Sequence, residues 1–256
     1  MNNTIQSNGF FGKLKNTKKR YWVLAILVVL IINGIVTTIL EGGGDSRTGT
    51  QAASPASDFQ VELVRENTGV RIRRYTGSAT NVVIPAYIES LPVKVIGREA
   101  FLNNTRIANV VIPEGVDSIE GRAFDGASNL RSISIPNSVT FIGQGAFRGT
   151  GFTSFTWPAQ VTTINQNMFF GARNLRTVTL PSTITRIYTD AFANCTSLTT
   201  VNIPDSLTSI DFHPVLSTFS GGVFREGGPN RAFRGSPNLN LATQARLREL
   251  GYLGGF

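Results

Sequence analysis

Few residues in this chain are of the types that carry out catalysis. It has one histidine, His213, and one cysteine, Cys195. A nucleophile triad needs a histidine with an acidic partner, and Asp211 lies two residues before His213. No nucleophile motif surrounds any serine, however, and no Walker or dinucleotide-binding glycine pattern occurs. Cys195 aligns with Ala127 and Ala172 in the internal repeat described below, which indicates a packed small side chain. We therefore expect no enzymatic activity, no catalytic residue and no cofactor.

Metal-binding patterns are equally weak. One histidine and one cysteine cannot supply the four ligands of a structural zinc site. Four carboxylates, Glu114, Asp117, Glu120 and Asp125, could suggest calcium. Their spacing fits no EF-hand loop, and the segment follows a core pattern. We predict no metal site.

The remaining chemistry is hydrogen bonding by rows of small polar residues. Short alternating segments carry Ser, Thr or Asn between apolar residues, with an arginine before two of them. If these segments stack as strands, their outward side chains form one polar ladder, and repeat proteins bind partners on such extended faces. The alternative is that Ser and Thr merely suit exposed strand positions. The candidate binding residues are Arg131, Ser132, Ser134, Thr156, Arg176, Thr177, Thr179, Thr200 and Asn202.

An internal repeat of about 23 residues positions these side chains. Phe101, Phe124, Phe147, Phe169 and Phe192 follow one another at intervals of 23, 23, 22 and 23 residues. Prolines and isoleucines keep the same period, including the unit that is one residue shorter. Low complexity would not hold a register through such a deletion, so the period predicts a repeat solenoid.

Each unit contains six recurring apolar positions. In one unit they are Val116, Ile119, Phe124, Leu130, Ile133 and Ile135. Stacking turns each position into a continuous strip of core, because every residue lies above its counterpart in the next coil. The alternating run that ends each unit stops at a proline, which predicts one short strand per unit in a parallel sheet. The Ala-Phe pair is the expected packing anchor opposite that strand.

The complete pattern, IP-x-x-V-x-x-I-x-x-x-AF-x-x-x-x-x-L-x-x-V-x-IP, extends from Val82 to Gly251. It resembles the BspA-like (TpLRR-type) leucine-rich repeats found in bacterial and protist surface proteins. The segment before the first unit, DFQVELVRENTGVRIRRYTGSATNVVIPAYI, also resembles the lead-in of that family. The resemblance implies a leucine-rich-repeat solenoid and a cell-surface or exported binding protein, often an adhesin. It supplies no catalytic motif and no site residue.

The two ends of the repeat array depart from the pattern. Residues 58–81 contain two alternating runs around Asn67-Thr68-Gly69, which predict a β-hairpin that caps the array. Its arginines, Arg71, Arg73 and Arg74, could bind a polyanion, but we favour a solvated strand face. Residues 241–256 predict a capping helix and a short tail.

The solenoid itself is expected over residues 82–240, with an insertion at about 212–229. The insertion could be a binding loop or could fold back to cover the end of the array. We favour the second interpretation.

The N-terminus explains most of the charge. Residues 1–20 carry five basic and no acidic residues, whereas residues 41–256 carry 19 basic and 16 acidic residues, a net charge of +3. That balance does not predict a nucleic-acid partner. Residues 21–40 are apolar over a length of roughly 30 Å, which predicts a transmembrane signal-anchor helix. Residues 41–57 follow as a flexible linker.

The basic cluster before the apolar segment predicts that residues 1–20 stay in the cytoplasm and the repeats are exported. The protein would then be a single-pass membrane protein at a cell surface or in a periplasm, or a secreted protein after cleavage. We expect a non-enzymatic, adhesin-like protein that binds another protein or extracellular macromolecule. The alternative is a self-associating scaffold of the cell envelope. The oligomeric state and the ligand do not follow from the sequence.

Overall fold

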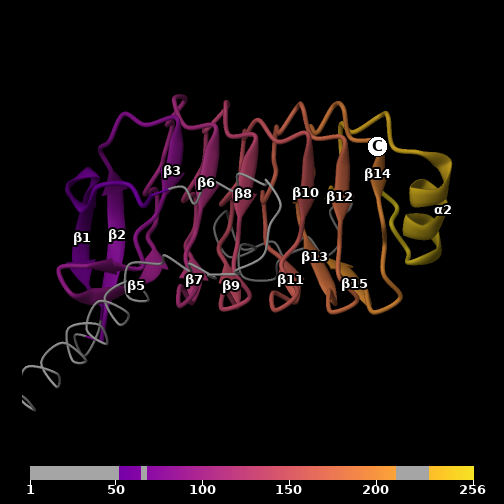
Figure 1. Cartoon of the computed structure of the whole chain (residues 1–256). Coiled ribbons are helices and arrows are strands. Elements are labelled where there is room, and N and C mark those ends of the chain that lie inside the picture. The colour runs from indigo at the N-terminus through magenta and orange to yellow at the C-terminus, as the bar shows by residue number, and fades with distance from the viewer. Residues whose placement is uncertain (1–51, 65–67, 212–230) are drawn as a thin grey trace, which may run out of the picture. The chain divides into compact units, whose positions relative to one another are not determined.

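Two parallel strand ladders run along the stacked coils. The computed structural model describes residues 52–64, 68–211 and 231–256, and residues 54–256 form one compact unit (Figure 1). The first ladder consists of β3 (Asn81–Val83), β6 (Asn109–Val111), β8 (Ser132–Ser134), β10 (Ser154–Thr156), β12 (Thr177–Thr179) and β14 (Thr200–Val201). The second consists of β5 (Leu91–Ile96), β7 (Ser118–Ile119), β9 (Phe141–Ile142), β11 (Thr163–Ile164), β13 (Arg186–Tyr188) and β15 (Ser209–Asp211). The predicted solenoid is therefore confirmed.

The prediction of one strand per repeat is wrong, because each regular coil contributes a strand to both ladders. The second strand comes from the Val-x-x-Ile step. Ile119 is fully buried, and it pairs with Ile96 on one side and Ile142 on the other. From β7 to β15 this strand is only two or three residues long, so its sequence shows too little alternation to be recognised.

A hairpin lies at the N-terminal end of the coils. Strand β1 (Phe59–Leu63) pairs antiparallel with β2 (Val70–Tyr75), as the alternating pattern predicts. Strand β2 then pairs parallel with β5, so the hairpin continues the second ladder. The longer first repeat contains β4 (Tyr87–Ile88), which turns back onto β5 through Glu89 and Ser90. Both turn residues have positive φ angles, the geometry of a tight two-residue hairpin turn.

A helix lies at the opposite end, where α2 (Leu241–Glu249) begins after Asn240. The Asn240 side chain accepts a hydrogen bond from the Thr243 amide, which is a normal N-terminal cap. Thr243 is buried, and its hydroxyl donates to the Val201 carbonyl at 3.1 Å. The helix thus provides a hydrogen-bond partner for a backbone group at the outer edge of β14.

Aromatic rings form a continuous column through the core. The repeated phenylalanines stack with centroid separations of 4.8 Å between Phe101 and Phe124, and 5.8 Å between Phe124 and Phe147. Phe192 stacks on Phe233 at 5.0 Å although 41 residues separate them in the sequence. The ring stacking therefore continues from Phe192 to Phe233; segment 212–230 between them lies outside the described residues.

The turn that carries each phenylalanine from Phe101 to Phe192 uses left-handed backbone at two points. One precedes the ring by two residues, as at Arg122 (φ 59°), and the other follows it by two, as at Gly126 (φ 75°). The second position is Asn or Gly in every coil, the residues that adopt this conformation most readily. At Gly126 a Cβ atom would also collide with the Asn103 side chain of the preceding coil.

Both ladders are interrupted at the same junction. Strands β8 and β10 belong to different sheets, and so do β9 and β11. This is the junction at which the repeat is one residue short. Aromatic residues replace the usual aliphatic ones there: Phe152, Phe155 and Trp157 are buried, and Trp157 donates from Nε1 to the Val161 carbonyl at 3.0 Å.

The aromatic column predicts a large difference between two phenylalanines six residues apart. Phe147 is fully buried among Phe124, Phe152, Phe155 and Phe169, whereas Phe141 is 50% exposed. Phe147→Ala should lower the free energy of unfolding by about 3–5 kcal/mol, because it leaves a cavity in the core. Phe141→Ala should change it by about 0.5 kcal/mol or less. Urea unfolding followed by circular dichroism measures both; equal losses would contradict the column.

Candidate functional site

The outward face of the first ladder carries the predicted binding residues. Arg131, Ser132 and Ser134 are exposed on the coil that contains β8. Thr156, Arg176, Thr177 and Thr179 are exposed on the coils of β10 and β12. The alternation of inward apolar and outward polar residues places them there, since successive side chains of a strand point to opposite faces.

The junction divides this face into two parts. The first part lies on β3, β6 and β8, and the second on β10, β12 and β14. Arg131, Ser132 and Ser134 therefore lie on one sheet, while the predicted residues from Thr156 onward lie on the other. The continuous ladder expected from the sequence is absent between β8 and β10.

The first part contains residues that the repeat pattern did not identify. The Asn109 side chain donates to the Asn81 side-chain oxygen at 2.6 Å, and the Ser132 hydroxyl donates to Asn109 at 2.6 Å. These three residues form one polar row across three coils. Asn81 and Asn109 occupy equivalent positions in their repeats, which is the signal that could have revealed them.

The second part contains two rows of hydroxyls. Ser154, Thr177 and Thr200 occupy successive paired positions, and Thr156 pairs with Thr179 beside them. Neighbouring strands of a sheet lie about 4.8 Å apart, so the residues of each row follow one another at that strand spacing. Such rows offer regularly spaced donors and acceptors over a flat face.

Two predicted residues at the end of this face have structural partners. The Asn202 side chain accepts from the Leu180 amide at 2.6 Å and donates to the Leu180 carbonyl at 2.8 Å. Asn240, at the start of α2, donates to the Thr200 hydroxyl at 3.1 Å. These contacts use hydrogen-bonding groups that the sequence alone assigns to a ligand.

Two arginines supply the charge of the face. Arg131 and Arg176 lie just before β8 and β12, and their backbone amides donate to the preceding coil at 2.7 and 2.8 Å. Within residues 52–64, 68–211 and 231–256, neither side chain has an ion-pair partner. Both guanidinium groups are therefore available to an acidic or hydrogen-bond-accepting ligand.

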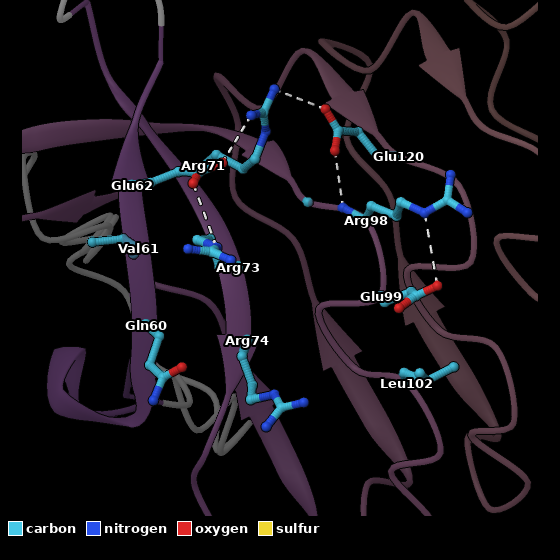
Figure 2. A pocket seen from close by; sticks show the side chains of 11 residues that line it. Gln60, Val61, Glu62, Arg71, Arg73, Arg74, Arg98, Glu99, Leu102 and Glu120 are labelled. Carbon is cyan, nitrogen blue, oxygen red and sulfur yellow. Dashed lines mark hydrogen bonds and ion pairs between the residues drawn. The ribbon is translucent and has the colours of Figure 1, made fainter.

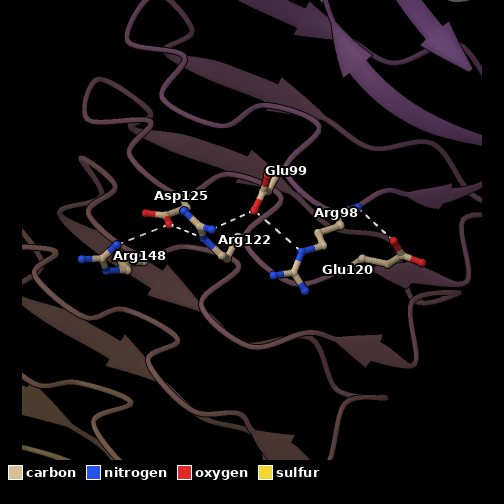
Figure 3. Close-up of polar contacts among 6 residues, drawn as sticks. All are labelled: Arg98, Glu99, Glu120, Arg122, Asp125 and Arg148. Carbon is tan, nitrogen blue, oxygen red and sulfur yellow. Dashed lines mark hydrogen bonds and ion pairs between the residues drawn. The ribbon is translucent and has the colours of Figure 1, made fainter.

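A second polar surface consists of linked ion pairs on the first coils (Figure 3). Arg122 contacts Glu99 at 2.7 Å and Asp125 at 2.9 Å, and Arg148 also reaches Asp125 at 3.5 Å. The hydrogen bond that the Arg122 guanidinium donates to the Asp125 carboxylate raises the pKa of Arg122. Asp125 is only 4% exposed, so these arginines compensate a buried carboxylate.

The carboxylates considered for calcium do not converge. Asp117 pairs with Lys94 at 3.6 Å, Glu120 with Arg71 at 2.9 Å, and Asp125 with the arginines above. Over the described ranges, no group of three or more His, Cys, Asp or Glu side chains could hold a metal ion. His213 lies outside the described residues.

The predicted membrane-spanning segment, residues 21–40, also lies outside the described residues. Among the residues whose structure is described, no helix is long and apolar enough to cross a membrane.

Comparison with known proteins identifies the repeat. A family model described as "BspA type Leucine rich repeat region" matches residues 94–214 in six copies. A leucine-rich repeat protein from T. pallidum is 25% identical, with a TM-score of 0.59; the alignment covers 80% of this chain and 98% of that one. No curated protein matches the chain.

Two further solved structures match over part of their length. A leucine-rich cell surface protein from Faecalibacterium prausnitzii is 28% identical, with a TM-score of 0.47, and the match covers 66% of this chain and 52% of that one. A leucine-rich repeat protein from Eubacterium ventriosum is 22% identical, with a TM-score of 0.48, and the corresponding coverage is 68% and 52%.

The buried cysteine gives a pH-dependent prediction. Burial raises the pKa of the Cys195 thiol from 9.0 to about 12, and a backbone hydrogen bond opposes part of the shift. The unfolded chain ionises near 9.0, so the buried thiol contributes its full stability below that pH and loses it as the pH rises toward 12. Above pH 9, the free energy of unfolding should fall more steeply in the wild type than in Cys195→Ala, by up to about 1.4 kcal/mol per pH unit.

Urea unfolding at pH 7, 9 and 10.5 measures this difference. Cys195→Ala is a conservative control, because alanine occupies the same position at Ala127 and Ala172. Identical slopes for the two proteins would show that the thiol ionises freely in the folded state.

Proposed function

The repeats of this chain belong to the BspA-type leucine-rich-repeat family, and from this premise we propose that the protein is an exported, membrane-anchored binding protein of the adhesin type. The repeat region binds another protein or an extracellular macromolecule and has no catalytic role. Leucine-rich repeats build a rigid framework that presents an extended face, which suits recognition more than chemistry.

One observation supports this function most strongly. The hydroxyl rows on β10 and β12 lie on a rigid sheet, with Arg176 beside them and Arg131 on the neighbouring sheet. A large partner can contact several coils at once, and it gains many weak hydrogen bonds without ordering a flexible loop. The two arginines add charge-assisted contacts, which favour partners with acidic groups.

The N-terminal sequence supports export. Residues 21–40 serve as the anchor, residues 1–20 remain in the cytoplasm, and residues 41–53 separate the coils from the membrane. The linker expected over residues 41–57 is shorter, because Ser54 already hydrogen-bonds to β3. The hairpin and α2 act as caps of the array. Ser54, which precedes the hairpin, accepts from the Val83 amide at 3.1 Å on the outer edge of β3. Thr243 of α2 accepts from the Val201 amide at 3.4 Å on the edge of β14, which supports the capping role of the helix.

A self-associating envelope scaffold is the second candidate. Leu241 and Leu253 are 82% and 83% exposed at the α2 end of the coils. Exposed leucines at one end could join two molecules. Sedimentation of the full-length chain in an uncharged detergent distinguishes the candidates, because a concentration-dependent oligomer that Leu241→Ser with Leu253→Ser abolishes favours the scaffold.

The binding function predicts the effect of removing both arginines. Cells displaying Arg131→Gln with Arg176→Gln should attach to target cells or extracellular matrix at least about tenfold more weakly than wild type, since each arginine loses a charge-assisted contact. The matched control is Arg106→Gln with Arg173→Gln, which removes the same charge from exposed positions elsewhere. Equal attachment by the strand-face variant and the wild type would place the binding site elsewhere.

A further inference from the structure

A pocket of about 620 Å³ lies between the N-terminal hairpin and the first coil (Figure 2). Arg73 and Arg74 reach it from β2, and Arg98 reaches it from the turn that follows β5. Figure 2 shows Arg74 and Arg98 on opposite sides of the space. Leu102 and Val61 are its apolar residues. The pocket is separate from the strand face.

The acidic residues of this pocket are already neutralised. Arg71 contacts Glu62 and Glu120, both at 2.9 Å, and the hydrogen bond with Glu62 raises the pKa of Arg71. Glu99 is held at 2.7 Å by Arg122, which does not line the pocket. Four arginines and three glutamates line the space, a net charge of +1, and Arg122 compensates one of the glutamates from outside.

The guanidinium groups of Arg73, Arg74 and Arg98 therefore have N–H donors available for a ligand. Arg73 contacts Glu62 at 3.4 Å and Arg98 contacts Glu99 at 3.7 Å, in both cases through Nε. Their terminal Nη groups are not used in these ion pairs. In the part of the chain that the structure describes, the Arg74 side chain has no partner. The glutamates thus pair with Nε of these two exposed arginines and leave their Nη donors available.

The number of arginines indicates the kind of anion. A carboxylate has two oxygens, which one guanidinium can satisfy with two parallel hydrogen bonds. A phosphate or sulfate ester presents three free oxygens and can accept from several guanidinium groups at once. We propose that this pocket binds the sulfate or phosphate ester groups of an anionic polysaccharide.

The surroundings favour a polysaccharide over other carriers of such groups. The pocket is partly open to solvent, so a group attached to a larger molecule can enter it. A peptide would need a large apolar anchor pocket, and only Val61 and Leu102 provide apolar contact. A nucleic acid would need a basic stripe along several coils, whereas residues 41–256 carry a net charge of only +3.

Binding of labelled dextran sulfate to the full-length chain, in an uncharged detergent at low ionic strength, tests the proposal. Wild type should bind saturably and more tightly than it binds inorganic sulfate. Arg74→Gln and Arg98→Gln should each weaken binding about tenfold, and added salt should weaken it further. Arg173→Gln is the matched control, an exposed arginine outside the pocket, and it should bind as wild type does. Circular dichroism verifies that each variant is folded.

Several results would overturn the proposal. The pocket is not the site if wild type does not bind dextran sulfate, or if both pocket variants bind as wild type does. Equal loss in Arg173→Gln would indicate a general charge effect. The ester assignment fails if a carboxylated dextran competes equally well, and the polysaccharide assignment fails if an oligonucleotide of equal charge binds as tightly. Loss of cell attachment in the Arg131→Gln and Arg176→Gln double variant tests the strand face and not this pocket.

Discussion

Stacking of one aromatic ring per coil is the interaction on which the rest of this structure depends. The coils contribute Phe101, Phe124, Phe147, Phe169, Phe192 and Phe233 to this column. Phe59 and Tyr75 of the hairpin extend it at one end, and Tyr252 and Phe256 after α2 extend it at the other. Neighbouring centroids lie 4.8–5.8 Å apart. A ring can meet its neighbours only if each coil returns the chain to the same point, which fixes the period at about 23 residues. The left-handed residues on either side of each ring from Phe101 to Phe192 make that return possible.

The column also explains what the fold tolerates. Both strand ladders stop where one residue is missing, yet Phe147 still stacks on Phe169 at 5.7 Å. Likewise, Phe233 stacks on Phe192 across the long insertion. The strand ladders can thus be interrupted while the core continues, because the stacked rings and the turns beside them keep successive coils aligned. The consequence for function is a strand face in two parts, each with its own arginine.

Features that recur in every coil could be predicted from the sequence. The apolar columns and the solenoid follow from the repeat period, since stacking demands the same residue type at the same position. The paired strands of the hairpin follow from two alternating runs around a turn. Single-coil features were harder to predict. The two-residue strand at Ser118–Ile119 is too short to show alternation. The sequence predicts that the Asn202 side chain binds a ligand, whereas in the structure it hydrogen-bonds to the Leu180 backbone.

The pocket beside the hairpin shows a different limit. The sequence predicts one solvent-exposed row of arginines, Arg71, Arg73 and Arg74. The structure shows that these arginines have different contacts. Arg71 joins Glu62 to Glu120, a residue of another coil, while Arg74 has no partner in the described regions. Distances between coils depend on the packing of the whole array, so spacing within one segment cannot reveal which charges meet.

Protease treatment of intact cells tests most directly whether the repeat region is displayed outside the cytoplasm. The repeats are detected with an antibody before and after digestion. Export predicts that they are cut on intact cells, or as soon as an outer envelope layer is opened, while a cytoplasmic marker stays whole. Protection until the plasma membrane itself is broken would contradict the account and place the binding faces in the cytoplasm.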